Sequence, residues 1–341
     1  MVKIYTVDDP FRGKTPDRST LVSRARSWDA SETIDRVLIG YSSIWSSNMA
    51  TAGYLFAQTE RVGLIVAHRP GVMHPAAAAR FFGTLDRLCG GRLALNIVTG
   101  SSDKDMAREG DYEIKARRYD RASEYVQLMN RAWREQDAFD FQGDYYRADG
   151  VRHMLRPESA HLPIFMGGDS DDAVKFGAQL ADIYMLWGEP LKGTQERIER
   201  VGAAAAEHGR KPEFSLSLRL FLGETDEEAW AKANAVATTI EQAQGSGRFL
   251  RSSSGDTSVG RQRQLEVAKT EKHDDCFWSR LVSLLGGFAN SAALVGTPDR
   301  VLDSLKAYRD LGIESFLLTT GADGLWEPEL EGFLQRVKRE L

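Results

Sequence analysis

The stretch RLALNIVTG, residues 92–100, combines the apolar pattern of a buried β-strand with one polar residue in its middle. Leu93, Leu95 and Ile97 are the apolar positions, and Asn96 interrupts them. A buried amide without a hydrogen-bond partner costs about 1–3 kcal/mol. The stretch therefore predicts a buried strand, and it raises the question of which group pairs with Asn96.

Runs of similar character recur along the chain and alternate with longer amphipathic segments. The eight predicted strands cover residues 2–7, 36–41, 63–68, 93–98, 163–167, 182–187, 214–222 and 314–319. Helical periodicity marks residues 74–88, 119–135, 192–208 and 299–312. This alternation predicts a (β/α)8 TIM barrel. A doubly wound sheet is the alternative, but its usual Gly-rich turn after the first strand is missing from VDDPFRGKT (7–15).

Two segments interrupt the alternation, and we expect both to be insertions in a single domain that covers residues 1–341. FDFQGDYYRADGVRHMLRP (139–157) has period-2 character around Gly143 and predicts a hairpin-like insertion. Residues 244–290 begin with many Gly, Ser and Arg residues. Loops longer than about 12–15 residues inside a domain are usually functional or disordered. We predict a mobile lid at 244–290, with a merely disordered insertion as the alternative.

Composition limits the classes of partner. The net charge of −5 gives no reason to expect nucleic acid or an anionic membrane surface. Two widely spaced cysteines, Cys89 and Cys276, form no disulfide framework or zinc ligand set. The acidic N-terminus does not resemble a signal peptide, and the longest weakly polar stretch (281–296) is too short to span a bilayer. We expect a cytoplasmic protein.

Functional groups of a (β/α)8 barrel gather at the carboxyl ends of its strands. The candidates at these positions are Tyr41, Ser42, His68, Asn96, Ser170, Trp187 and Arg219. The sequence contains no HExxH, GxxxxGK[ST], GxSxG or CxxC motif, which disfavours metal-dependent, P-loop and serine-hydrolase chemistry. No metal site is predicted.

The segment FMGGDSDDA (165–173) has two interpretations. A strand, a Gly-Gly turn and a helix start can hold a phosphate on backbone N–H groups and the Ser170 hydroxyl. The alternative is a capped helix, with Asp169, Asp171 and Asp172 stabilising its own dipole and repelling a phosphate. Arg117, Arg118 and Tyr119 supply a counter-charge if their helix start lies alongside. The motif alone does not decide between them.

Trp187 and Arg219 are the other two unusual side chains. Trp187 either packs in the core or forms a wall for a flat cofactor. Arg219, between two leucines in a strand, requires an anion if it points into the barrel. That anion is either a ligand or a structural carboxylate on a neighbouring strand.

Six segments together resemble the bacterial-luciferase-like flavin monooxygenases, and most closely the alkanesulfonate monooxygenase group. The segments are TLDRLCGGRLALNIVTGSS (84–102), RRYDRASEYVQLMNRAW (117–133), FDFQGDYY (139–146), FMGGDSDDA (165–173), MLWGEP (185–190) and ALVGTPDRV (293–301). The resemblance implies a (β/α)8 barrel that uses O2 and reduced FMN (FMNH2), delivered by a separate NAD(P)H-dependent flavin reductase. It also implies a homodimer or homotetramer.

The resemblance implies a role for each matching residue. Asn96 would hydrogen-bond the isoalloxazine edge of the flavin. The remaining contacts would be Arg118, Tyr119 and Ser170 at the phosphate and ribityl chain, Tyr41 and Ser42 at the ring, and Asp105 more weakly. The NIVTG form favours FMN over the deazaflavin F420.

The implied chemistry is attack by a flavin C4a-(hydro)peroxide on a small organic substrate, with Arg219, His68 and Trp187 facing that substrate. The chain differs from the alkanesulfonate monooxygenase group at five positions of the part expected to bind the sulfonate. These positions are Trp45, Ser217, Phe288, Gly321 and Asp323. Three functions therefore stay open. They are desulfonation of an organosulfonate, oxygenation of a C–N, heterocyclic or ketone substrate, and flavin binding without catalysis.

Overall fold

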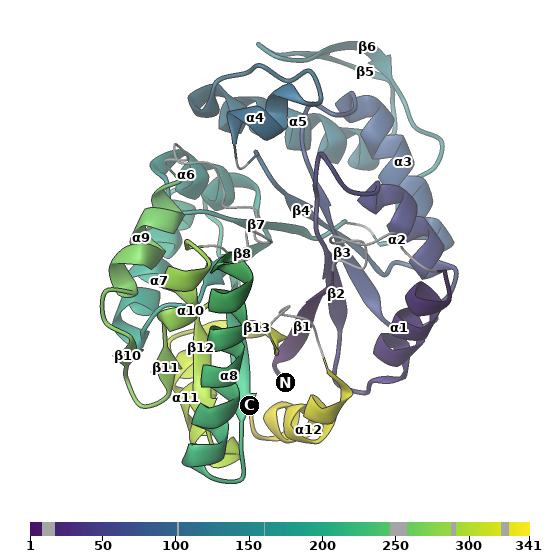
Figure 1. The fold of residues 1–341 in the computed structure, drawn as a ribbon. Helices are drawn as coiled ribbons and strands as arrows, with labels where there is room; N and C mark the ends of the chain where they lie inside the picture. Colours follow the sequence, from purple (N-terminus) through teal and green to yellow (C-terminus); the bar gives the residue numbers. More distant parts are fainter. Residues whose placement is uncertain (9–17, 101, 160, 246–257, 288–290, 322–326) are drawn as a thin grey trace.

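The computed structural model shows a closed barrel of eight parallel strands surrounded by helices (Figure 1). It describes residues 1–8, 18–100, 102–159, 161–245, 258–287, 291–321 and 327–341. The barrel strands are β1 (Lys3–Asp8), β2 (Arg36–Ile39), β3 (Gly63–His68), β4 (Leu93–Ile97), β7 (Ile164–Gly167), β8 (Ile183–Trp187), β9 (Glu213–Leu222) and β13 (Ile313–Thr319). They pair in chain order, and β13 closes the ring against β1. The predicted (β/α)8 fold is confirmed.

Helices follow the barrel strands and form the outer layer. The main ones are α1 (Arg18–Ala30), α2 (Asn48–Phe56), α3 (Pro75–Leu88), α5 (Lys115–Arg134), α6 (Asp171–Leu180), α7 (Leu191–Ala206), α8 (Asp226–Gly245), α11 (Pro298–Asp310) and α12 (Glu331–Glu340). Shorter helices are α4 (Asp103–Ala107), α9 (Val259–Val267), α10 (Arg280–Leu284) and the 3-10 turn η1 (Pro328–Leu330). Within the described ranges, no helix has both the length and the apolar character needed to cross a membrane.

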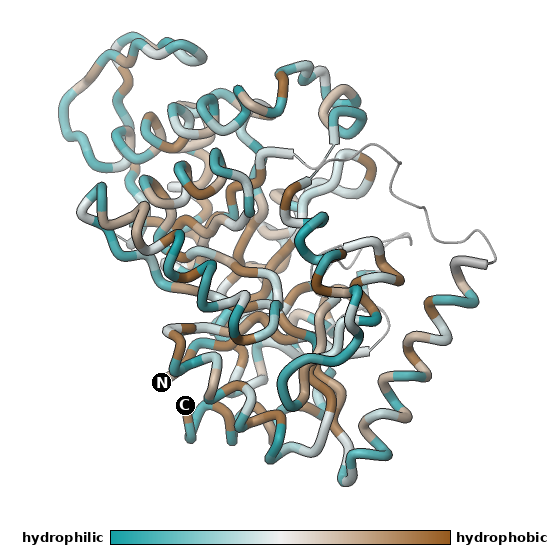
Figure 2. Tube along the Cα trace, turned by 90° about the vertical axis from the view of Figure 1, so that its left-hand side faces the viewer, coloured by the Kyte–Doolittle hydropathy of each residue, from teal (hydrophilic) through white to brown (hydrophobic). Residues whose placement is uncertain are grey.

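Strand side chains alternate between two separate apolar layers. Tyr5, Ile65, Ala94, Phe165, Ile183 and Leu317 fill the barrel interior. Their strand neighbours pack outward against the helices in a much larger cluster. Figure 2 shows hydrophobic residues along the inner strands and hydrophilic residues toward the periphery. Burying one large apolar side chain contributes about 1.5–3 kcal/mol, so both layers stabilise the barrel.

The strand β9 is longer than its neighbours and carries a short extension of the sheet outside the barrel, which we call the side sheet. Its first part pairs with β8, from Ile183↔Glu213 to Trp187↔Ser217. On the same edge, its last part pairs with β12 (Ala293–Gly296), starting at Arg219↔Ala293. The strands β11 (Phe277–Trp278) and β10 (Lys272–His273) extend this side sheet, which lies between α8 and α11.

The segment predicted as a lid therefore contains regular elements where the structure describes it. Between 244 and 290 lie the end of α8, then α9, β10, β11 and α10, whereas residues 246–257 and 288–290 are outside the described ranges. The prediction of mobility stays a prediction.

The segment 139–157 contains β5 (Phe139–Gln142) and β6 (Arg147–Val151), which pair antiparallel at the top of Figure 1. The Gly143 N–H donates to the Tyr146 carbonyl at 2.9 Å across the turn. Glu124 of α5 accepts the backbone N–H groups of Asp144, Tyr145 and Tyr146 at 2.8–3.1 Å. A side chain at Gly143 would collide with this carboxylate, so glycine is needed there.

Candidate active site

The carboxyl ends of the barrel strands form a mouth, and Asn96 points into it. Ala94, two residues earlier on β4, belongs to the interior layer, so the strand alternation places Asn96 on the same inner face. Its side chain is partly exposed. Among the residues that the structure describes, none hydrogen-bonds the Asn96 amide. The amide that the sequence singled out thus lies on the inner face of β4 without a hydrogen-bond partner among the described residues.

His68, predicted to face the substrate, lies on the other face of its strand. Leu64 and Val66 of β3 pack outward, and His68 follows the same alternation. Its Nε2 hydrogen-bonds the Tyr125 hydroxyl at 2.7 Å, and its ring packs edge-on against Phe82. Complete burial, with a smaller contribution from Arg69, lowers the pKa of His68 to about 3. We therefore leave this neutral, helix-facing imidazole out of the proposed site.

Tyr41 and Ser42 lie at the rim beside α4. The Tyr41 hydroxyl donates to Glu109 Oε2 at 2.5 Å, and the Arg69 guanidinium lies 5.0 Å from the Tyr41 ring centre. Burial and the nearby Glu109 raise the pKa of Tyr41 above its ordinary value. The Ser42 hydroxyl accepts the Ile44 N–H at 3.3 Å. Tyr41 therefore stays protonated and can donate a hydrogen bond.

For Arg69, the sequence indicates only a position at the end of a predicted strand, and it predicts no role. Arg69 follows β3, is almost fully buried, and forms an ion pair with Glu109. Its Nη1 also contacts Met106 Sδ at 3.3 Å. The only sequence signal was a charged residue directly after a buried strand, which is also typical of solvated loops.

Asp105 and Arg118 connect α4 to its neighbours. Asp105 Oδ2 accepts the Ser102 hydroxyl at 3.0 Å, and Oδ1 accepts the Ser43 hydroxyl at 3.3 Å. Arg118 is buried in α5 and donates from Nη2 to Asp103 Oδ1 at 2.5 Å and from Nε to the Glu113 carbonyl at 2.8 Å. The Asp103 side chain is 88% exposed, so an anion arriving from the mouth could replace it on Arg118.

Tyr119 and Ser170 meet at the start of α6. A methyl group placed on Gly168 would lie 3.4 Å from the Tyr119 hydroxyl, which puts Tyr119 beside this loop. Ser170 caps α6, and its hydroxyl accepts the Ala173 N–H at 3.2 Å. Gly167 and Gly168 are also needed for packing, because side chains there would collide with the Met185 carbonyl and with Ala173. The segment is thus a capped helix start, and the Tyr119 hydroxyl lies beside the loop that precedes it.

Two of the three acidic residues of this segment are neutralised from α7, whereas Asp172 has no ion-pair partner among the described residues. Asp169 forms an ion pair with Arg197, and Asp171 forms one with Arg200. The sequence argument against an anion at this position assumed that these carboxylates were uncompensated. With two of the three paired, the repulsion of a phosphate is weaker.

Trp187 faces the barrel interior under α9. Ile183 and Met185 on the same strand belong to the interior layer, and Trp187 continues their side. A side-chain carbon at Gly260 would lie 3.2 Å from the Trp187 ring. Nearby, Gln264 donates to the Gly188 carbonyl at 3.1 Å, and Arg263 Nε lies 2.7 and 2.8 Å from the two Glu189 carboxylate oxygens. The helix α9 thus covers the end of β8.

Arg219 lies across the mouth from Asn96 on the β9–β13 wall. Leu216, Leu218 and Leu220 pack outward, so Arg219 faces inward, and it is 4% exposed. Its Nη1 donates to the Gly321 carbonyl. On the neighbouring strand, Thr319 pairs with Arg219, and its buried hydroxyl has no hydrogen-bond partner within the described residues. This wall therefore combines a guanidinium with hydroxyl groups.

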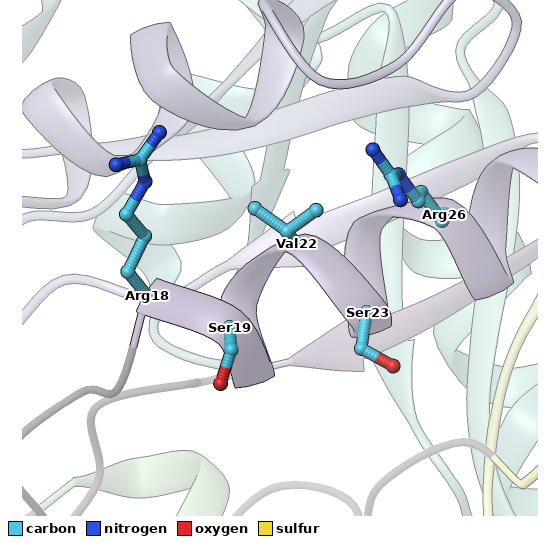
Figure 3. Close-up of a pocket in the computed structure, with 5 residues that line it drawn as sticks. All are labelled: Arg18, Ser19, Val22, Ser23 and Arg26. Atoms are coloured by element: carbon cyan, nitrogen blue, oxygen red, sulfur yellow. The ribbon is translucent and has the colours of Figure 1, made fainter.

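A separate shallow pocket lies on the outer helix layer (Figure 3). Arg18 and Arg26 extend to one side of α1, and Ser19 and Ser23 extend to the other. None of the residues that line it belongs to a barrel strand. It contributes nothing to the mouth.

Comparison with known proteins assigns a family to this arrangement. The family model described as luciferase-like monooxygenase matches residues 13–315.

Solved structures with the same fold differ in cofactor and substrate. A riboflavin lyase, solved with modified FMN and riboflavin, is 18% identical over 99% of this chain and 91% of its own, with a TM-score of 0.77. The oxygenating constituent of 3,6-diketocamphane monooxygenase from Pseudomonas putida, in complex with FMN, is 19% identical over 99% and 96%, with a TM-score of 0.70. An F420-dependent secondary alcohol dehydrogenase is 16% identical over 98% and 96%, with a TM-score of 0.67. At these identities the likeness establishes the fold alone.

Proposed function

Because the chain belongs to the luciferase-like monooxygenase family, and is therefore a flavin-dependent monooxygenase, we propose that it is the oxygenating component of a two-component system that uses FMNH2. The observation that carries this proposal is the Asn96 amide, which points into the mouth without a hydrogen-bond partner among the described residues. A flavin ring edge presents the alternating donors and acceptors that such an amide can pair with.

The polar groups of the mouth fit FMN at both of its ends. Asn96 would hold the ring, with Tyr41 and Ser42 beside it and Asp105 more distant. Arg118, Tyr119, Ser170 and the N-terminus of α6 would hold the terminal phosphate. Bound reduced FMN would supply the electrons that activate O2, while the protein orients the ring and excludes water. A terminal phosphate monoester matches these donors, which supports FMN over F420.

The substrate would bind on the opposite wall, between Trp187 and Arg219. Arg219 would hold a polar or anionic group, and Trp187 would pack against the apolar part of a small organic molecule. An organosulfonate, as in the alkanesulfonate monooxygenase group, is one such substrate. A C–N, heterocyclic or ketone substrate is the alternative, and Ser217 in place of a second cation on this wall favours it.

Reduced flavin would come from a separate NAD(P)H-dependent reductase. We also propose a homodimer or homotetramer and a reducing cytoplasmic environment, in which the buried free thiols of Cys89 and Cys276 stay reduced.

Anaerobic titration of the purified protein with FMNH2 tests the cofactor. We expect saturable binding that is tighter than for oxidised FMN, and failure to bind FMNH2 would refute the proposal. Addition of O2 and a panel of sulfonates, amines, heterocycles and ketones then tests the reaction. Sulfite release indicates desulfonation, whereas a product heavier by one oxygen atom without sulfite indicates the alternative. If no panel member accelerates O2 consumption, the non-catalytic flavin barrel becomes the better interpretation.

A further inference from the structure

One buried arginine outside the proposed contacts organises the loop at the start of α6. Arg197 lies in α7 and is 5% exposed. Its Nη2 donates to the Gly168 carbonyl at 2.9 Å, and its Nη1 forms the ion pair with Asp169. Glu189 Oε1 lies 3.9 Å from the same nitrogen. One guanidinium thus holds the backbone and the carboxylate of a single loop.

Two nearby carboxylates compensate the positive charge of Arg197. Burial, with repulsion from Arg263 and Arg200, lowers the pKa of Arg197 to about 9, so it stays mainly charged at neutral pH. A buried guanidinium is tolerated only when it is paired and hydrogen-bonded. Asp169 and Glu189, both nearly fully buried, provide that pairing.

These contacts fix the direction of the loop amides. Arg197 binds the Gly168 carbonyl, and Arg200 Nη1 donates to the Asp169 carbonyl at 3.0 Å, so both oxygens point toward α7. In a trans peptide, the following N–H points the opposite way. The N–H groups of Asp169 and Ser170 are therefore turned away from α7. Within the described part of the chain, neither of them has an acceptor.

We infer that Arg197 is a positioning residue, which turns the N–H groups of Asp169 and Ser170 toward the phosphate of the cofactor and neutralises Asp169 beside it. This inference rests on the proposed function. Arg197 itself does not touch the cofactor. Without it, the Asp169 carboxylate would repel the phosphate, and the Gly168 carbonyl would keep the Tyr184 hydroxyl, which donates to it at 2.8 Å, but would lose its donor from α7.

The test compares reduced FMN with reduced riboflavin, which lacks the phosphate. Anaerobic binding of both is measured for wild type and Arg197→Met. Wild type should prefer FMN. The variant should lose about tenfold in affinity for FMN and stay within about twofold for riboflavin. Equal losses for both flavins, or no loss for FMN, would overturn the inference.

A matched control exists at the other end of the same helix layer. Arg210 donates to the Ala181 carbonyl at 2.8 Å and lies 3.3 Å from Asp182 Oδ1, so it repeats the carbonyl-plus-carboxylate arrangement of Arg197. Arg210→Met should leave the FMN-to-riboflavin affinity ratio unchanged. If it lowers the ratio as much as Arg197→Met does, the effect is general destabilisation and the inference fails.

Two more variants separate charge from geometry. The double variant Arg197→Met with Asp169→Asn should recover part of the FMN affinity, because the repelling charge is gone. Arg197→Lys keeps the charge but cannot bind the carbonyl and the carboxylate at the same time. Its FMN-to-riboflavin affinity ratio should therefore lie between those of wild type and Arg197→Met. If Arg197→Met does not fold, Arg197→Lys replaces it, and an unchanged ratio would overturn the inference. Failure of wild type to bind either flavin would contradict the proposed function instead, and the inference with it.

Discussion

The two ends of the barrel use similar polar residues in different ways. At the amino ends of the strands, which we call the floor, carboxylates pair with neighbouring donors, although the buried Ser215 and Ser315 hydroxyls have no hydrogen-bond partner within the described residues. Asp182 accepts the His161 Nε2 at 2.6 Å and the Ile164 N–H at 2.8 Å, and Asp35 accepts the Ile4 N–H at 2.7 Å. At the mouth, by contrast, Asn96 and Thr319 have no such partner among the residues described. Both ends are built from the same strands.

This difference separates stability from function. Although burial alone would raise its pKa, hydrogen bonds from His161 and Ile164 hold the pKa of Asp182 below its ordinary value. A carboxylate with a lowered pKa stabilises the folded state. Under the proposed function, the unpaired Asn96 and Thr319 side chains of the mouth would instead form their hydrogen bonds with a ligand. We therefore expect floor variants to change stability and mouth variants to change binding or turnover.

Arg219→Met should give the largest effect. Loss of a buried, substrate-facing cation typically lowers turnover by about 100-fold. Affinity for FMNH2 should stay within about twofold of wild type, because Arg219 lies on the opposite wall. Steady-state O2 consumption with an accepted substrate and anaerobic titration measure the two quantities. Undiminished turnover would remove Arg219 from the site.

Asn96→Leu should weaken FMNH2 binding by about 30-fold, or about 2 kcal/mol, without lowering the melting temperature. Asn48→Leu is the matched control, because the Asn48 amide already donates to the Ala67 carbonyl. That variant should lower the melting temperature. If Asn96→Leu lowers the melting temperature as much as Asn48→Leu does, the distinction between the hydrogen-bonded Asn48 amide and the unpaired Asn96 amide would be wrong.

The buried His68 predicts a loss of stability in acid. Its folded pKa of about 3 lies below the unfolded value of about 6.5, so the unfolded state binds the proton first as pH falls. Stability from this residue is complete above pH 6.5 and declines below it, by about 2 kcal/mol between pH 7 and pH 5. Denaturant unfolding of wild type and His68→Gln should show that difference in slope. If the free energy of unfolding has the same pH dependence in both proteins, this prediction is wrong.

Asp182→Asn should lower the free energy of unfolding by about 1–2 kcal/mol at pH 7 and leave FMNH2 affinity unchanged. The wild-type advantage depends on the ionised carboxylate. It should therefore be present above the unfolded pKa of about 4 and disappear as pH falls through the lower folded value. Chemical denaturation at pH 7 and pH 3 checks both. A loss of flavin binding without a loss of stability would contradict the expectation that floor variants change stability and mouth variants change binding.

The sequence predicted the barrel well because its strands are short, apolar and regularly separated by helices. It could not predict which face of β3 points inward, since every residue from Gly63 to His68 is buried. When both faces of a parallel strand are apolar, the alternation of its side chains does not show which face points into the barrel. His68 was assigned to the wrong face for this reason. Asn96 could be singled out because it is the only polar residue of its strand, and its role as a flavin contact stays a prediction.

The side sheet and Arg197 escaped prediction for a different reason. The strands β10 and β11 have two residues each, which is too short for a period to show. Arg197 lies in a predicted amphipathic helix, where arginines normally face solvent. Its burial depends on the Gly168 carbonyl and Asp169, which are distant in the chain. Contacts of this kind are set by the assembled fold and leave no local signature.

The shared edge of β9 has an evolutionary consequence. Gly188 lies where β8 and β12 diverge, and a side chain there would collide with the Ser217 carbonyl and Ala292. The Arg219 N–H is bound by the Ala292 carbonyl at 2.9 Å, so the backbone that carries Arg219 is set by the side sheet. Mutations in that sheet could shift this guanidinium while β4 and α6 stay as they are. Mutations selected for a new substrate could thus act on the wall that carries Arg219 and leave the proposed flavin contacts on β4 and α6 unchanged.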